Sequence, residues 1–188
     1  MVRFKSRVVT EGNIADNSVT TAKILDGTIT NAKMDVDEGH NIEVKYKTAD
    51  ESVNNSTTLQ NDDHLVTSSL PANSIWLVEL SVYHLANTDA TGDFKFAFVG
   101  SATANMGIGG LIMDAADALA NVLYTAGAGG IAFGAAAAGS FRRLFLTGAV
   151  VVGATAGTLQ FQWAQNGLVA QNYTVGTNYS YMIVRRVS

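Results

Sequence analysis

A short tandem repeat near the N-terminus constrains the fold of this chain more than any other feature. Residues 14–23 read IADNSVTTAK, residues 24–33 read ILDGTITNAK, and Met34 begins a third copy. Segments this short cannot bury their own apolar side chains, so they fold only against neighbouring copies or against other chains. Two copies are too few to stack into a solenoid by themselves. The repeat therefore predicts self-association, or docking on a larger partner.

We expect residues 1–38 to form an extended arm that contains this repeat. Residues 1–11 alternate as an edge strand does when it adds to another sheet, and the acidic residues 35–41 form a hinge that marks a domain boundary. The apolar side chains expected to anchor the arm and to face partner chains are Val2, Phe4, Val8, Ile14, Val19, Ile24, Ile29 and Met34. A frayed terminus and a flexible linker are the alternatives to docking.

Residues 39–188 have the composition of one folded domain, because the 188-residue chain is 47% hydrophobic and only 15% charged. Runs that are apolar or alternate with period two predict strands at 42–47, 75–84, 94–98, 140–152, 158–165 and 179–187. The near-continuous apolar run at 75–84 indicates burial on both faces or a central position. About eight strands, with no convincing helix, predict an all-β fold: an antiparallel β-sandwich that is jelly-roll-like.

Three segments are less regular. Residues 60–64 read as a turn between two short strands, and Gly148 suggests a bulge within the strand at 140–152. Residues 106–139 are rich in glycine and alanine. They predict a long loop, with room for a short helix at 114–119, packed at a subunit interface or forming an ordinary flexible excursion.

Composition excludes several classes of function. The chain has no cysteine, so it can form neither a disulfide nor a thiolate metal site. A net charge of −4 argues against nucleic acid as the main partner, since phosphate binding needs clustered Lys and Arg. No apolar segment is long enough to span a bilayer, and residues 1–7 lack the apolar core of a secretory signal. We therefore expect a protein made in a cytoplasm, with no membrane partner.

No catalytic motif stands out, and we expect neither an enzyme nor a cofactor. His40, His64 and His84 are scattered without metal-like spacing. Residues 61–63 carry oxygen ligands that could hold a cation, but the full calcium-loop pattern is absent. Glu79, with Asp89 or Asp93, could form a carboxylate pair for glycoside cleavage if the chain folded them together.

The repeat resembles that of a known class of proteins. Residues 18–24 (SVTTAKI) and 28–34 (TITNAKM) are similar to the short S-V-T-x-A-K repeats of tailed-bacteriophage fibre and head-decoration proteins. Residues 56–65, 70–76 and 179–185 also look like parts of a β-sandwich domain of such virion proteins. The resemblance implies a homotrimer, with the arm as its trimer interface and the sandwich heads beyond it. It carries over no catalytic residue.

Three hypotheses follow. The first is a homotrimeric capsid decoration (cement) protein on the virion exterior, whose arm binds the major capsid protein or another virion protein. The second is a tail-fibre or receptor-binding protein that recognises a host surface glycan through exposed aromatic residues. The tyrosines expected to be available for such a ligand are Tyr124, Tyr173 and Tyr179. The third, a carbohydrate-active enzyme, has only the carboxylates named above.

Overall fold

The computed structural model describes residues 42–86, 93–100, 103–113, 119–125, 130–133 and 141–188. Contacts divide the chain into Met1–Glu38 and Gly39–Ser188, and all described residues lie in the second unit. The arm, with its repeat and its anchoring residues, is outside the described residues. So are residues 114–118 of the segment considered for a short helix.

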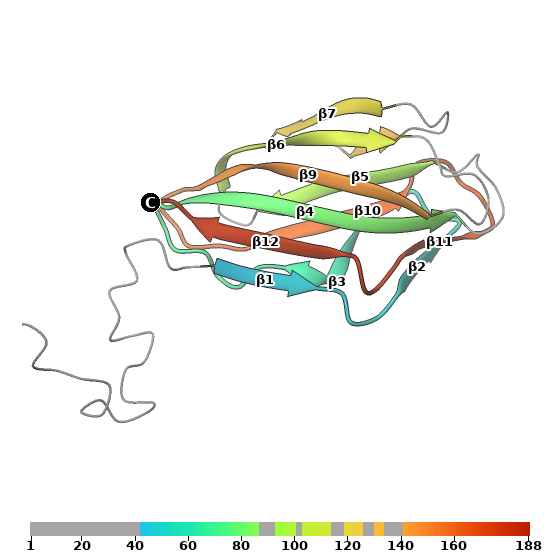
Figure 1. The fold of residues 1–188 in the computed structure, drawn as a ribbon, viewed down its shortest axis with the longest axis horizontal. Coiled ribbons are helices and arrows are strands. Elements are labelled where there is room, and N and C mark those ends of the chain that lie inside the picture. The colour runs from blue at the N-terminus through green and yellow to red at the C-terminus, as the bar shows by residue number, and fades with distance from the viewer. Residues whose placement is uncertain (1–41, 87–92, 101–102, 114–118, 126–129, 134–140) are drawn as a thin grey trace, which may run out of the picture. The chain divides into compact units, whose positions relative to one another are not determined.

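The described residues form an antiparallel β-sandwich of two sheets (Figure 1). One sheet has eight strands in the order β1-β12-β4-β9-β6-β7, with β11 pairing β4 and β2. The other has four, in the order β3-β10-β5-β8. The strands are β1 (Ile42–Tyr46), β2 (Glu51–Asn54), β3 (Gln60–Val66), β4 (Ile75–Ala86), β5 (Phe94–Gly100), β6 (Thr103–Met113), β7 (Leu119–Thr125), β8 (Ile131–Phe133), β9 (Phe141–Val152), β10 (Leu159–Gln165), β11 (Asn172–Val175) and β12 (Tyr181–Arg186). The predicted all-β sandwich is confirmed.

The core lies between the two sheets and is built from alternate residues of their longest strands. Apolar side chains of β4 and β9 face apolar and aromatic side chains of β5 and β10. Phe94 stacks on Trp163, and Phe96 on Phe161, with ring centroids 5.9 and 6.2 Å apart. Because side chains alternate between faces with period two, these positions also fix which residues of each strand point away from the core.

Two predictions of irregular backbone, a turn and a bulge, are wrong. Residues 60–64 are not a turn between two strands but part of strand β3, although the pairing of β3 with β10 shifts register between Asn61 and Val66. Gly148 is not a bulge either, since its register with β4 and β6 runs through without a shift. A Cβ at position 148 would overlap the backbone carbonyl of Gly107 on β6, so the glycine permits close strand approach.

The glycine-rich segment was expected to be a loop, but it contributes strands to both sheets. β6 and β7 pair with each other and β6 pairs with β9, while β8 pairs with β5. At Gly110 a Cβ would overlap the carbonyl of Phe145. The small residues therefore do allow close backbone approach, as expected from the sequence, but between strands of one sheet.

Candidate functional site

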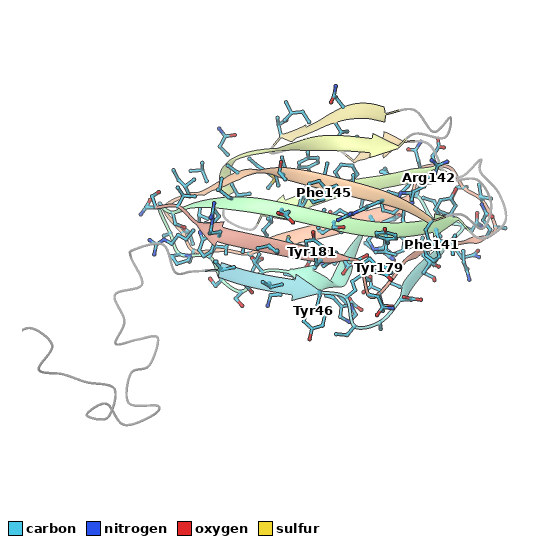
Figure 2. All side chains as sticks on the ribbon, viewed as in Figure 1. Tyr46, Phe141, Arg142, Phe145, Tyr179 and Tyr181 are labelled. Carbon is cyan, nitrogen blue, oxygen red and sulfur yellow. The ribbon has the colours of Figure 1, made fainter. Side chains whose placement is uncertain are left out.

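The side chains that the eight-stranded sheet turns away from the core form an unusually apolar surface, here called the outer face. Large apolar residues on it retain between 36% and 67% of their accessible surface. They are Ile42, Val44, Tyr46, Ile75, Leu77, Leu123, Phe141, Phe145, Val151 and, in the loop before β12, Tyr179. Figure 2 shows four of its aromatic residues, Tyr46, Phe141, Phe145 and Tyr179, spread over this sheet. A surface of this kind is typical of an interaction site.

The edge strand β1 has the reverse of the usual polarity. Its apolar side chains Ile42, Val44 and Tyr46 are exposed on the outer face. The alternate positions are charged: Glu43 and Lys45 pair with each other at 2.7 Å, and Lys47, directly after the strand, is buried. A strand that covers a core in the ordinary way directs its apolar side chains towards the core and its charged side chains towards solvent. This inversion indicates that the outer face of β1 is the side meant for burial.

A groove of about 800 Å³ runs across the outer face where β1, β12, β4 and β9 lie side by side. It is lined mainly by Ile42, Val44, Leu77, Glu79, Ile183 and Arg185. Glu79 accepts a hydrogen bond from the Tyr181 hydroxyl at 2.9 Å. Burial, and then this bond to Glu79, raise the pKa of Tyr181. The groove is thus apolar, with one carboxylate and one guanidinium available to a partner.

A second depression, here called the aromatic hollow, lies at the other end of the outer face. It has a volume of about 250 Å³ and is lined mainly by Asp50, Tyr83, Phe141, Thr177, Asn178 and Tyr179. The rings of Tyr83 and Tyr179 are tilted, with centroids 5.0 Å apart, and Figure 2 shows Phe141 close to Tyr179. The Thr177 amide donates to Oδ1 of Asp50 at 2.7 Å. Aromatic walls with a few fixed polar groups are typical of small-molecule sites.

The three tyrosines expected to be available for a ligand differ in exposure. Tyr179 is exposed in the aromatic hollow. The expectation is wrong for Tyr124 and Tyr173, which are buried core residues. Tyr124 folds over the aromatic core and donates to the Phe98 carbonyl at 2.8 Å, and Tyr173 lies on β11, between β2 and β4. The expected anchoring residues, from Val2 to Met34, lie outside the described residues.

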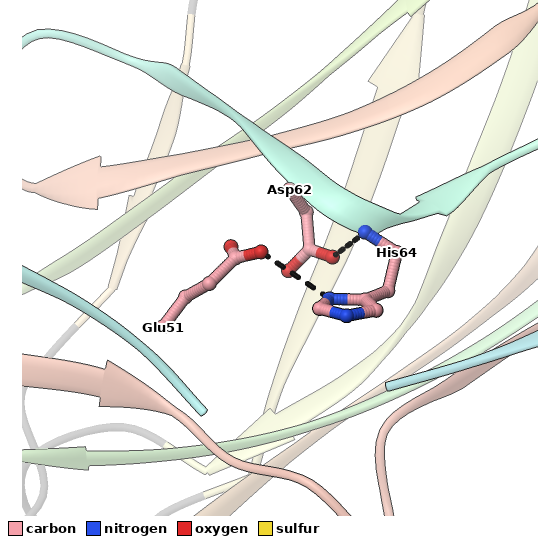
Figure 3. Close-up of side chains that lie close together, drawn as sticks. All are labelled: Glu51, Asp62 and His64. Atoms are coloured by element: carbon pink, nitrogen blue, oxygen red, sulfur yellow. Dashed lines mark hydrogen bonds and ion pairs between the residues drawn. The ribbon is translucent and has the colours of Figure 1, made fainter. Parts of the chain in front are cut away.

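Four polar side chains, here called the lysine cluster, meet between the two sheets: Lys47, Glu51, Asp62 and His64. Figure 3 shows Glu51, Asp62 and His64, whose ligand atoms lie within 4.8 Å of one another. Lys47 Nζ lies 2.7 Å from Asp62 Oδ2 and 3.3 Å from Glu51 Oε2. An ammonium group therefore already supplies the positive charge that a metal ion would bring. The neighbouring Asn61 and Asp63 are exposed whereas Asp62 is buried, so residues 61–63 do not converge on one ion.

The carboxylates considered for glycoside cleavage are not brought together. Glu79 is on the outer face of β4, whereas Asp93 precedes β5 in the four-stranded sheet. Asp89 lies outside the described residues, as does His40.

His84 is a buried titratable group of the core. It stacks on Phe94, with ring centroids 4.3 Å apart, and lies opposite Arg142 in the register of β4 and β9. Burial, and then the charge of Arg142, lower the pKa of His84 to about 3. The imidazole is therefore neutral in the folded protein at neutral pH.

The comparisons with known proteins add no relative. No family model matches the chain, and neither a curated protein nor a solved structure matches it. Among the described residues there is no helix long and apolar enough to cross a membrane.

Acid should destabilise the sandwich through His84. Below its ordinary pKa of 6.5 this histidine takes up a proton in the unfolded chain but not in the folded one. The free energy of unfolding should therefore fall as pH falls from 6.5 towards 3, by at most about 1.4 kcal/mol per pH unit. Urea unfolding at several pH values should show this slope, and the His84→Gln variant should show a shallower one. Equal slopes in both proteins would contradict the assignment.

Proposed function

We propose that this chain is a structural protein of a bacteriophage particle, a homotrimeric capsid decoration protein on the virion exterior. In this account the arm of residues 1–38 attaches the protein to the major capsid protein or another virion protein, and the trimer contacts expected of the arm are too weak to hold the copies together without the sandwich. The β-sandwich joins the copies to one another through its outer face. The resemblance of the repeat supports the bacteriophage assignment, and the exposed outer face is the observation that carries the self-association.

The area of the outer face supports a second copy as its partner. At roughly 200 Å² for a large side chain, the exposed apolar residues of the outer face that lie outside the aromatic hollow present on the order of 800 Å². The largest apolar patch of an ordinary monomer is about 300–600 Å², and a standard interface buries about 800 Å² per partner. An apolar area of this size suits a permanent interface more than a transient one.

The charges of the groove favour the same partner. Glu79 and Arg185 lie on adjacent strands of one face, so a second copy of the chain carries a charge of opposite sign for each of them. Neither charge needs a different protein for its neutralisation. A copy of this chain thus offers both the apolar surface and the counter-charges.

The alternative function, recognition of a host surface glycan, is favoured by the aromatic hollow. Sugar rings present apolar faces that pack on aromatic side chains, and their hydroxyl groups donate to carboxylates such as Asp50. The hollow lies near the junction of β4 and β11, away from the groove. Both uses of the sandwich are compatible in one protein when the interface between copies covers the groove and leaves the aromatic hollow open.

Charges placed in the groove should separate the copies. The double variant Val44→Asp, Leu77→Asp would bury two carboxylates against an apolar surface, at a cost of several kcal/mol. In sedimentation experiments we expect about three times 19.8 kDa for the wild type and 19.8 kDa for the variant. The matched control is Leu168→Asp, which changes an exposed leucine in the loop between β10 and β11. A double variant that keeps the wild-type mass would show that the outer face is not the interface.

Removal of the arm should abolish attachment without unfolding the sandwich. A protein that lacks residues 1–34 should keep the β-sheet circular dichroism spectrum of the full chain. It should no longer bind virus particles from which this protein has been stripped, as measured by co-sedimentation. If the truncated protein decorates the particles as well as the full chain does, the arm does not anchor the protein.

Glycan binding should depend on Tyr179. If the hollow holds a sugar ring, Tyr179→Ala should weaken binding to an array of bacterial surface glycans by roughly fivefold, since ring stacking contributes about 1 kcal/mol. Tyr46→Ala is the matched control, because Tyr46 is equally exposed but lies outside the hollow. If no glycan on the array binds the wild type, or if both variants bind like the wild type, the alternative function is wrong.

A further inference from the structure

The lysine cluster contains a buried amine in contact with a buried carboxyl group. Lys47 Nζ lies 2.7 Å from Asp62 Oδ2, and both side chains have no exposed surface. Lys47 directly follows β1 of the eight-stranded sheet, whereas Asp62 is on β3 of the four-stranded sheet. The contact therefore bridges the two layers of the sandwich.

An amide bond forms from the neutral form of an amine and a carboxyl group. Two charges removed from water lose their hydration, which reduces the free-energy cost of moving one proton from the ammonium to the carboxylate. Transfer of one proton from the ammonium to the carboxylate gives a free amine beside a carboxylic acid. A desolvated lysine amine is a nucleophile. The fold already holds the carboxyl group of Asp62 next to it, so the entropy cost of bringing the two reacting groups together has been met by folding.

The carboxyl group of Asp62 is polarised by the backbone. Its second oxygen, Oδ1, accepts hydrogen bonds from the amides of His64 at 3.0 Å and Leu65 at 2.9 Å. Two fixed N–H donors on one oxygen are the arrangement that stabilises the negative charge of a tetrahedral intermediate in acyl transfer. They leave Oδ2, the oxygen next to the amine, as the one that can depart.

Glu51 is placed to carry a proton between the two reacting groups. Its Oε2 lies 3.3 Å from Lys47 Nζ and is buried without a hydrogen bond. Its Oε1 accepts a hydrogen bond from the backbone amide of Asp63 at 2.8 Å and lies 3.4 Å from His64 Nδ1. The hydrogen bond holds the Glu51 side chain in position. A carboxylate held beside a reacting nitrogen is a general base and then a general acid.

From these contacts we propose that Lys47 and Asp62 form an intramolecular amide (isopeptide) bond, with Glu51 as the catalytic proton carrier. Lys47 Nζ attacks Cγ of Asp62, and an N–C bond forms while the negative charge collects on Oδ1. Glu51 takes a proton from the nitrogen and delivers it to the Oδ2 hydroxyl. The Cγ–Oδ2 bond then breaks and one water leaves. Glu51 ends in its starting state, and no oxidant or reductant is needed.

The bond would change how the sandwich carries load. β1 is an edge strand that pairs only with β12 among the described residues. A covalent link from the residue after β1 to β3 ties this edge to the opposite sheet. Force applied to β1 from the N-terminal side would then reach both sheets. The inference does not depend on the proposed function, because any protein with this cluster could form the bond.

Intact-mass spectrometry of the denatured full-length protein tests the proposal. The wild type should be lighter than its sequence by one water, about 18 Da, in most molecules. Peptide mapping should recover one branched peptide that joins Lys47 to Asp62. Lys47→Arg should have its full sequence mass. Glu51→Gln keeps both reacting groups but lacks the proton carrier, so bond formation should slow by at least about 100-fold.

The matched control is Lys45→Arg, which changes the lysine that pairs with Glu43 on the same strand and should leave the loss of water intact. Circular dichroism confirms that each variant is folded before its mass is interpreted. A wild type that keeps its full sequence mass after prolonged incubation would overturn the proposal, leaving an ordinary ion pair. So would a loss of water that persists in Lys47→Arg, or one that maps to other residues.

Discussion

The packing of the two sheets against each other is the interaction on which the rest of this structure depends. Phe94, Phe96, Phe161 and Trp163 of the four-stranded sheet are fully buried against the inner side of the larger sheet. Because side chains alternate along a strand, burying one set exposes the other set. In β4 and β9 both sets contain large apolar residues. The burial that forms the core thus leaves an apolar outer face that a single chain cannot cover.

The edge strand β1 shows that this outer face is not incidental. Isolated exposed apolar residues are common on proteins, but β1 directs all its apolar side chains outward and its charges inward. The inward charges Glu43, Lys45 and Lys47 are each paired. The same inversion explains two features: Ile42 and Val44 line the groove, and Lys47 reaches Asp62 between the sheets. One strand therefore links the proposed interface and the proposed cross-link.

Sequence patterns predicted the strands with strong period-two alternation and missed those without it. The alternation of Leu159, Phe161 and Trp163 placed β10 correctly, and all three side chains are buried. β6 was missed because its glycines have no side chain to alternate, and their role, close approach to β9, depends on a distant strand. The sequence predicts a turn at residues 60–64 of β3 because Asp62 is a polar residue in a buried position. Only its partner Lys47, on another sheet, explains it.

The sequence predicts the candidate sites less well than it predicts the strands, because each site is assembled from segments that are distant in sequence. The continuous apolar run at 75–84 did indicate burial on both faces of β4, but only the core side is covered within one chain, since Leu77 remains 40% exposed. The alternation at 42–47 was visible, yet nothing in it told which side faced the core. Tyr124 lies in the glycine- and alanine-rich segment, and Tyr173 follows the turn residues 166–167. Both are buried because they lie on strands β7 and β11, which the local sequence patterns did not predict.

The central claim is that the outer face of the eight-stranded sheet is buried between copies of this chain. The most direct measurement is an experimental structure of the full-length oligomer, determined by cryo-electron microscopy or crystallography. The account predicts that Val44, Leu77 and Ile183 lie in a dry interface with another copy, and that Arg185 and Glu79 meet charges of opposite sign there. An oligomer in which this face is open to solvent, with the copies joined elsewhere, would contradict it.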